Sequence, residues 1–305
     1  MSRDLYIKAN ASAKEWVRPS DWLSMPTNIT SADQIFVGLH AVFESGQNYC
    51  AFSFTTSTGQ YQVDWGDGTV TLHNSNTIAQ KNYDYASISN STICSRGYKQ
   101  VIIKVTPVSG NLLTCNFQQR FVTTPAQNQA YSSGFLECIL SMPNASSGGS
   151  IIFGGVTIIR HAYCEKVDIK TIGNATIMQS MFQNCYSLQS VPLFNTQNVT
   201  NMVNMFSICF SLNFIPNFNT ALVTNFTNFA NGCSSLDRCT TIFRNSVGLQ
   251  NCQLSKDALV EILTNLIDRT TTTSATIDIT GNWGATALTS ADRLIATNKN
   301  YTITG

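Results

Sequence analysis

Charged side chains are scarce in this chain of 305 residues, where they make up 11% of the total, less than half of the usual share of about 25%. The polar surface must therefore come from Asn, Thr, Ser and Gln, a composition that is common in outward-facing β-rich proteins. The formal net charge is +1. Because Lys and Arg do not cluster and exceed the acids by only one, 18 against 17, the sequence predicts no nucleic-acid partner.

Long apolar runs are also missing. No stretch reaches the 18 consecutive apolar residues that a membrane span needs, so we expect no membrane insertion. The opening stretch, MSRDLYIKANASAKEW, lacks an apolar h-region, so we expect no classical signal peptide. Hydrophobic residues still make up 43% of the chain, enough to bury a core, and its length predicts two or three domains.

The motifs of common enzyme classes are absent as well. The chain has no H-E-x-x-H, G-x-S-x-G or Walker motif, and its carboxylates are scattered. Each of the three histidines has a structural interpretation: His40 lies in an expected strand, His73 follows one, and His161 occupies the repeat position described below. The sequence therefore predicts no catalytic residue, no cofactor and no metal site.

Cysteine, in contrast, is plentiful, with ten residues. Cys185, Cys209 and Cys233 are spaced 24 residues apart, and residues one repeat apart stack in one column of a repeat protein. Because three stacked thiols cannot all pair, free buried thiols are favoured over a disulfide framework, which remains the alternative. No C-x-x-C pair suggests zinc. Free thiols favour folding in a reducing cytosol.

The most informative feature is an internal repeat. Residues 178–201 and 202–225 are identical at 13 of 24 positions, a third copy starts at Phe226, and a fainter copy precedes them. A repeat of 20–29 residues indicates a solenoid, in which each copy buries its apolar side against the next.

Each copy is expected to contain a short helix and an extended segment. The i, i+3, i+6/i+7, i+10 spacing predicts one apolar helix face, followed by an extended stretch. The helix-face residues are Val199, Met202, Met205, Phe206 and Cys209, and the extended stretch contains Leu212, Ile215 and Phe218. Pro216 should lie at the start of a strand or just outside the ladder. Asn195 and Asn219 are expected to bond turn backbone.

The pattern MxxMFxxCxSLxxxPxFNTxxVTN resembles the leucine-rich-repeat variant of mycoplasma lipoproteins and bacterial surface antigens, over about 178–236 and back to roughly 136. The resemblance implies a binding solenoid used for surface display or adhesion, without catalysis. If a ligand binds the extended face, the candidate residues are Tyr186, Gln189, Phe210, Asn213 and Asn217.

The end of the chain has the pattern of a cap. Residues 254–269 form an amphipathic helix pattern with Ser255 as the N-cap. An alternating strand pattern (275–280), a second helix capped by Thr289 or Ser290, and a strand at 301–304 follow.

The first half reads as short strands, including YQVDWGDGTVTL (61–72) and YKQVIIKVTP (98–107). Their spacing predicts a β-sandwich, and Gly66 and Gly68 suit a tight hairpin. The W-G-D-G-T turn and the later Gly97-Tyr98 resemble the polycystic-kidney-disease-type immunoglobulin-like domain over about 35–110. That resemblance implies a spacer or interaction module. Asp64 and Asp67 either bond the turn backbone or bind calcium, and the first is favoured.

Residues 1–34 fit neither pattern and are interpreted as an N-terminal docking arm centred on Trp16, Arg18, Pro19 and Trp22. Exposed Trp is unfavourable, so these rings either pack on the chain's own sandwich or dock on a neighbouring subunit. The segment WxRPSDWLxMP before a GDGT sandwich also resembles N-terminal segments of tailed-phage virion proteins.

Together these patterns predict a mainly β protein with short helices. The expected parts are the docking arm (1–34), an Ig-like β-sandwich (35–120), a leucine-rich-repeat-like solenoid (121–253) and an α/β C-terminal cap (254–305). The expected function is that of a non-enzymatic bacteriophage virion surface protein, in head decoration or in a tail or fibre. Its partners would be other virion proteins, further copies of itself, and a host-surface glycan or protein. The alternative is a cellular surface adhesin, and an enzyme such as a glycan hydrolase ranks third.

Overall fold

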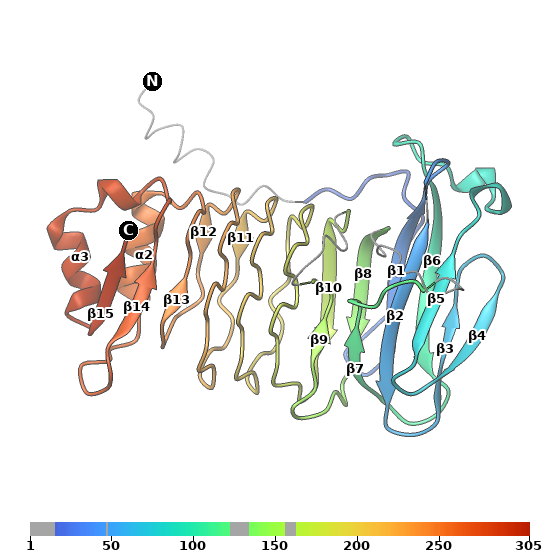
Figure 1. The fold of residues 1–305 in the computed structure, drawn as a ribbon, viewed down its shortest axis with the longest axis horizontal. Coiled ribbons are helices and arrows are strands. Elements are labelled where there is room, and N and C mark those ends of the chain that lie inside the picture. The colour runs from blue at the N-terminus through green and yellow to red at the C-terminus, as the bar shows by residue number, and fades with distance from the viewer. Residues whose placement is uncertain (1–15, 47, 123–133, 156–162) are drawn as a thin grey trace.

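The computed structural model describes residues 16–46, 48–122, 134–155 and 163–305. This part of the chain is mainly β, with open mixed sheets and two α-helices. The molecule is elongated: paired sheets form one end, stacked coils the middle, and the helices the other end (Figure 1). No helix in the described ranges is long and apolar enough to cross a membrane. His161 lies outside the described residues.

The elements follow the chain in a simple order. The strands of the first half are β1 (Ile35–Val42), β2 (Tyr49–Thr56), β3 (Gln60–Asp64), β4 (Val70–Asn74), β5 (Ile78–Asn82), β6 (Lys99–Pro107), β7 (Leu112–Asn116), β8 (Phe135–Ser141), β9 (Ile151–Ile152) and β10 (Lys166–Thr171). The second half contains β11 (Phe214–Ile215), β12 (Arg238–Cys239), β13 (Val247–Gly248), α2 (Lys256–Asn265), β14 (Ala275–Asp278), α3 (Ser290–Thr297) and β15 (Tyr301–Thr304). Short 3-10 turns occupy Tyr85–Ser87, Asn90–Thr92 and Ala285–Ala287.

Two sheets enclose the core of the N-terminal half. One has the strand order β10-β8-β1-β6-β3-β4 and the other β5-β2-β7-β9. Neighbouring strands are antiparallel except for the parallel pairs β8/β10 and β7/β9. The two strands expected within 61–72 and the strand expected at 98–107 are confirmed as β3, β4 and β6. Aromatic rings fill the space between the sheets, with Phe36 and Phe117 centred 4.7 Å apart.

The glycine-rich turn between β3 and β4 has the predicted backbone. Gly66 has a φ of 74°, and a Cβ there would lie 2.4 Å from the carbonyl oxygen of Ile102, so only glycine fits. The Asp64 carboxylate accepts from the backbone N–H of Gly66 at 3.0 Å. The Asp67 carboxylate accepts from the backbone N–H of Thr69 at 3.1 Å. Both aspartates therefore bond the turn, as the favoured interpretation predicted.

Both sheets continue into the repeats. Beyond residue 121, β8 joins the sheet beside β1, and β10 pairs with β8. A bridge then joins Lys166 to Ser190, one coil further along. The core is equally continuous, because Phe153 stacks on Phe182 with centroids 5.9 Å apart, and Phe182 stacks on Phe206 at 5.5 Å. The expected border at 120/121 thus coincides with no break in the sheets or the core.

The repeats stack as coils joined by parallel backbone bonds. Bridges connect Ile177 to Asn201 and Asn201 to Asn225, each one repeat apart. Where two coils meet, alternate residues donate backbone hydrogen bonds to the next coil. The N–H of Phe182 donates to the carbonyl of Met205 at 2.9 Å, and the N–H of Phe206 donates to the carbonyl of Phe229 at 2.8 Å. The period of 24 residues read from the sequence is therefore the length of one coil.

The prediction of a short helix in each copy is wrong. Residues 199–209 form a run of tight turns, because Asn204 and Ile208 have φ angles of 53° and 63°. A right-handed helix requires negative φ throughout. The same two left-handed positions recur in the neighbouring coils, at Ser180 and Asn184 and again at Asn228 and Gly232. The apolar spacing identified the buried side chains correctly, but overlapping turns bury them as well as a helix would.

The thiols form the expected column. All ten cysteines are buried thiols, and none forms a disulfide. The Sγ of Cys209 donates to the carbonyl of Phe182, and that of Cys233 to the carbonyl of Phe206, each at 3.0 Å. Burial raises the pKa of the Cys209 and Cys233 thiols, so they stay protonated and act as donors. Cysteine at this position thus supplies both a small apolar group and a bond to the preceding coil.

Polar residues at the coil corners have the predicted roles. The side chains of Asn195 and Asn219 each accept a backbone N–H two residues later, at 3.0 Å. Pro216 directly follows β11 and so lies just outside its ladder. Thr196 adds a bond between coils, since its hydroxyl donates to the carbonyl of Asn219 at 2.8 Å.

The predicted cap elements are also confirmed. The Ser255 hydroxyl accepts from the N–H of Ala258 at 3.2 Å at the start of α2. Thr289 forms a capping box with Asp292 at the start of α3. Strands β13, β14 and β15 form a parallel sheet beside these helices, which closes the last coil.

Candidate functional site

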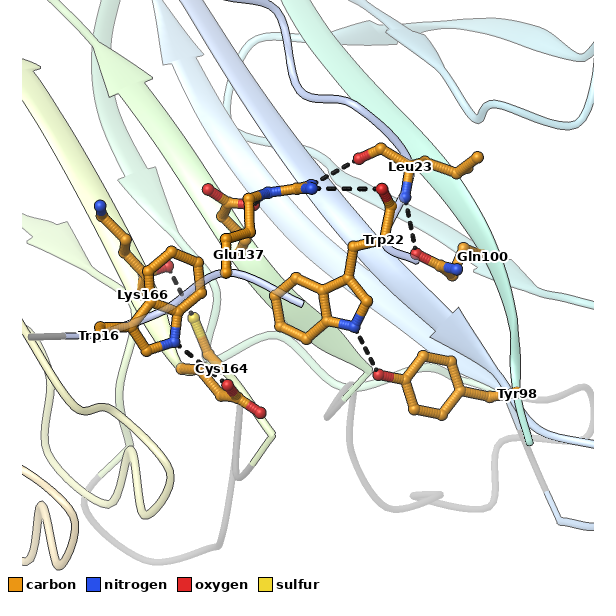
Figure 2. Close-up of polar contacts among 10 residues, drawn as sticks. Trp16, Trp22, Leu23, Tyr98, Gln100, Glu137, Cys164 and Lys166 are labelled. Atoms are coloured by element: carbon orange, nitrogen blue, oxygen red, sulfur yellow. Dashed lines mark hydrogen bonds and ion pairs between the residues drawn. The ribbon is translucent and has the colours of Figure 1, made fainter. Parts of the chain in front are cut away.

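The described part of the N-terminal segment lies on the outer face of the six-stranded sheet. Trp22 is buried among Leu39, Ala41, Tyr98 and Leu136. Its indole Nε1 donates to the hydroxyl of Tyr98 at 3.0 Å (Figure 2). Gln100, on β6 two residues after Tyr98, accepts from the backbone N–H of Leu23 at 3.0 Å. Residues far apart in the chain therefore anchor the segment through both a side chain and backbone.

Charged groups reinforce this attachment. The guanidinium of Arg18 pairs with Glu137 on β8 at 2.7 Å and also donates to the backbone carbonyls of Trp22 and Leu23. The indole of Trp16 donates to Glu165 at 3.2 Å, and Lys166 lies 4.9 Å from the centre of the Trp16 ring (Figure 2). Trp16 thus touches the segment that leads into β10.

The sequence left two interpretations of Trp16, Arg18, Pro19 and Trp22 open, and the structure shows these residues on the chain's own sheet. Pro19 belongs to a turn, since its carbonyl accepts from the N–H of Trp22 at 3.3 Å. The unfavourable exposure that motivated docking on a neighbouring subunit does not arise, because Trp22 is only 4% exposed.

A cavity of about 250 Å³ adjoins this segment, where the sheet meets the first coil. Aromatic and apolar groups form most of its wall, and a charged pair and one hydroxyl complete it. The lining residues are Phe43, Arg96, Tyr98, Leu136, Tyr163, Glu165 and Ser187. Its apolar wall with a few polar groups is typical of small-ligand sites, although its volume lies just below their usual range of about 300–1,000 Å³.

The polar groups of the cavity are already engaged. One oxygen of Glu165 accepts from Trp16, and the other pairs with Arg96. The hydrogen bond with Glu165 raises the pKa of Arg96, so the guanidinium remains charged. Burial likewise raises the pKa of Tyr98, which keeps its hydroxyl protonated. Because Glu165 is the one carboxylate of the lining and both its oxygens are held, this cavity suits binding better than acid–base chemistry.

An aromatic pair lies one step along the coils. The rings of Tyr186 and Phe210 are centred 4.7 Å apart with a tilt of 33°, and Phe210 is 42% exposed. Backbone holds the two residues in register, since the N–H of Ser211 donates to the carbonyl of Tyr186 at 3.1 Å. Ser187, the neighbour of Tyr186, lines the cavity. We call Tyr186 and Phe210 the aromatic shelf.

Gln189 and Asn213 follow the two shelf residues at the same offset in successive coils. The N–H of Gln189 donates to the carbonyl of Glu165 at 2.9 Å, and the carbonyl of Asn213 accepts from Asp237 at 3.0 Å. Both residues are partly exposed. Because Glu165, Gln189 and Asn213 are spaced one repeat apart, they lie in one column. Asn217 is exposed but lies beyond the other end of β11. Four of the five predicted ligand-face residues thus belong to one region, and Asn217 does not.

The cavity itself was not predicted from the sequence. Phe43 directly follows β1, Arg96 and Tyr98 directly precede β6, and Tyr163 and Glu165 come from the segment before β10. One signal was present, because Glu165 precedes Gln189 by one repeat length. Extending the repeat register backwards would have placed Glu165 beside the predicted face. Within the described ranges, no group of three or more His, Cys, Asp or Glu side chains is arranged to hold a metal ion.

One comparison with known proteins gives a match. Residues 156–251 match a family described as "Mycoplasma protein of unknown function, DUF285". The match covers the stacked coils and ends before the cap. No curated protein and no solved structure matches the chain.

Proposed function

We propose that this chain is a non-enzymatic surface protein of a bacteriophage virion, placed in head decoration or in a tail or fibre, and that it attaches to a host-surface glycan or protein. In this proposal the paired sheets are an Ig-like spacer of the polycystic-kidney-disease type, and the coils are a leucine-rich-repeat-like solenoid. The observation that carries it is the aromatic shelf beside the apolar cavity.

The shelf supports attachment on physical grounds. Exposed rings provide apolar area at a small entropic cost, and Tyr is enriched at binding surfaces. Amide groups in the next column, on Gln189 and Asn213, donate and accept hydrogen bonds without adding charge. Such a neutral surface suits sugars and protein backbone alike. The free thiols support synthesis in a reducing cytosol, where a virion protein is made.

A cellular surface adhesin remains the second candidate. The matched family is described from Mycoplasma, which is a cell and not a virus. Two measurements distinguish the candidates: quantitative mass spectrometry of purified phage particles, and labelling of intact cells with an antibody raised against the purified chain. Phage particles purified from the source culture should carry the chain in a fixed number of copies per particle, measured by quantitative mass spectrometry. Labelling of intact cells with no signal on particles would favour the adhesin.

The attachment site has its own test. Purified chain should bind intact host cells, and the double variant Tyr186→Ser with Phe210→Ser should reduce bound protein at least tenfold, since hot-spot aromatic residues each contribute about 2 kcal/mol or more. The matched control is Trp283→Ser, because Trp283 is 65% exposed but belongs to the cap. Equal loss in both variants, or no loss in the shelf variant, would count against the shelf.

A further inference from the structure

The two sheets have different kinds of edge. On one side both run on into the coils: Lys166 of β10 bridges to Ser190, and Ser150, next to β9, bridges to Ile177. On the other side the sheets end at β4 and β5. Figure 1 shows β4 at the extreme end of the molecule, away from the coils.

The edge at β5 is covered by the chain itself. The side-chain oxygen of Gln80 accepts from the backbone N–H of Val122, and its amide nitrogen donates to the Val122 carbonyl, both at 3.0 Å. This reciprocal pair imitates a strand partner. Strand β4 pairs only with β3 among the described strands. An edge strand without cover is a template for a further strand.

The outward backbone groups of β4 can be assigned. The N–H of Trp65 donates to the carbonyl of Thr69 at 3.0 Å, so the pair Trp65/Thr69 is hydrogen-bonded. Because bonded pairs alternate in an antiparallel ladder, Thr71 and His73 bond to β3. The N–H and C=O groups of Val70 and Leu72 therefore point away from the sheet.

The side chains of β4 separate into two faces. Thr71 accepts from the indole of Trp65 at 2.8 Å, and His73 stacks on Tyr61, so these two lie on the inner face of the sheet, at its margin, where Thr71 is exposed and His73 half-buried. Val70 and Leu72 are on the opposite face and are 54% and 55% exposed. The strand VTLHN contains no Lys, Arg, Asp, Glu or Pro, which are the residues that usually protect an edge.

We infer that β4 is a self-association edge, which pairs antiparallel with β4 of a second copy of this chain about a two-fold axis at Leu72. In this register Leu72 exchanges both backbone bonds with Leu72 of the second copy, and Val70 faces the second copy's Asn74. Both copies then contribute the same residues to the contact, with Leu72 against Leu72 at its centre, as an isologous interface requires. Charges of opposite sign accompany each other near this edge: Asp64 lies opposite Val70 in the β3/β4 register and opposite Lys104 in the β3/β6 register, and Asp67 forms an ion pair with Lys81 at 2.5 Å.

A second copy fits this edge better than a peptide of another protein. Backbone pairing alone accepts any strand, but the exposed side chain of Leu72 is best matched by an apolar side chain directly opposite. The strand supplies that partner to itself, because Leu72 faces Leu72 of the second copy when this residue lies on the axis. Five residues form a short interface, so the association is expected to be reversible and to depend on concentration.

Sedimentation equilibrium of the full chain over a wide concentration range tests the inference. The expected result is a monomer–dimer equilibrium, which Leu72→Lys weakens at least tenfold because it places two ammonium groups opposite each other. The matched control is Ile78→Lys, since Ile78 is an exposed residue of the covered edge strand β5. A monomer at all concentrations, higher polymers, or equal effects of both variants would overturn the inference.

Hydrogen exchange of the peptide that contains β4 provides a second measurement. The backbone amides of residues 70 and 72 should exchange more slowly as the concentration of the native chain rises. In the Leu72→Lys variant their exchange should not depend on concentration. Circular dichroism would show that the variant remains folded. The aromatic shelf lies on the coils, so failure of self-association leaves the cell-binding test of the shelf unaffected.

Discussion

The indole nitrogen of Trp22 donates to the hydroxyl of Tyr98 at 3.0 Å, across 76 residues of sequence. This bond and the burial around it attach the N-terminal segment to the outer face of the sheet. The segment also supplies Trp16, which holds one oxygen of Glu165 at the cavity. The segment that precedes the first strand therefore helps to shape the candidate binding region on the coils.

Replacing Trp22 should release this segment. Trp22→Ala removes a large buried side chain, and the free energy of unfolding should fall by about 3–5 kcal/mol. Trp22→Phe keeps most of the apolar contact and loses the hydrogen bond to Tyr98, so a smaller loss of about 1 kcal/mol is expected. Urea denaturation measures both. Val17→Ala is the control, because Val17 is 81% exposed, and a loss equal to that of Trp22→Ala would contradict the role of Trp22.

The ten cysteines should be unreactive until the chain unfolds. All are buried, and burial raises the pKa of Cys115 and of Cys239 to about 12. Because the thiolate is the reactive form, a disulfide reagent should label almost no thiol in native protein, even at pH 9. All ten should react in guanidinium. A thiol count below ten in the unfolded, unreduced chain would reveal a disulfide.

Ile208 is in an unfavourable backbone conformation. Its φ is 63°, whereas the equivalent positions one coil away hold Asn184 and Gly232, which accept this region more readily. Ile208→Asn should therefore raise the free energy of unfolding by about 1 kcal/mol, provided that little burial is lost, since Ile208 is only partly buried. Ile208→Val retains the β-branched carbon and should give no gain. A stabilisation of both variants by the same amount would assign the effect to side-chain packing.

The turn at Asp67 should make stability depend on pH. Burial acts to raise the pKa of this carboxyl, but hydrogen bonds from Lys81 and Thr69 outweigh it and hold the pKa below the usual 3.8. A carboxyl with a lowered pKa stabilises the fold above its unfolded pKa, and the contribution is lost as the pH falls towards the folded value. Asp67→Asn should thus lower stability at pH 7 and have a shrinking effect below about pH 4. Urea denaturation of the native chain and of Asp67→Asn between pH 2 and pH 7 measures the difference in their free energies of unfolding. A difference that stays constant with pH would refute the role of the Asp67 carboxylate.

The length of one coil and the identity of the side chains that fill it follow from the amino-acid sequence alone. Identical side chains 24 residues apart can be buried only if successive copies stack, so the column of Cys185, Cys209 and Cys233 followed directly from spacing. The cap at Ser255, a second cap at either Thr289 or Ser290, and the turn at Gly66 were also predicted from the sequence, because each depends on residues within a few positions of one another.

The backbone conformation of the coils, the position of Trp22 and the cavity depend on contacts between distant segments. The i, i+3 spacing cannot distinguish a helix from overlapping turns, and the left-handed backbone of Asn204 and Ile208 depends on the bonds between coils. The partner of Trp22 and the wall of the cavity come from strands and loops that meet only after the six-stranded sheet has formed and the coils have stacked beside it. Local patterns report which side chains are buried, while contacts between distant segments determine what they are buried against.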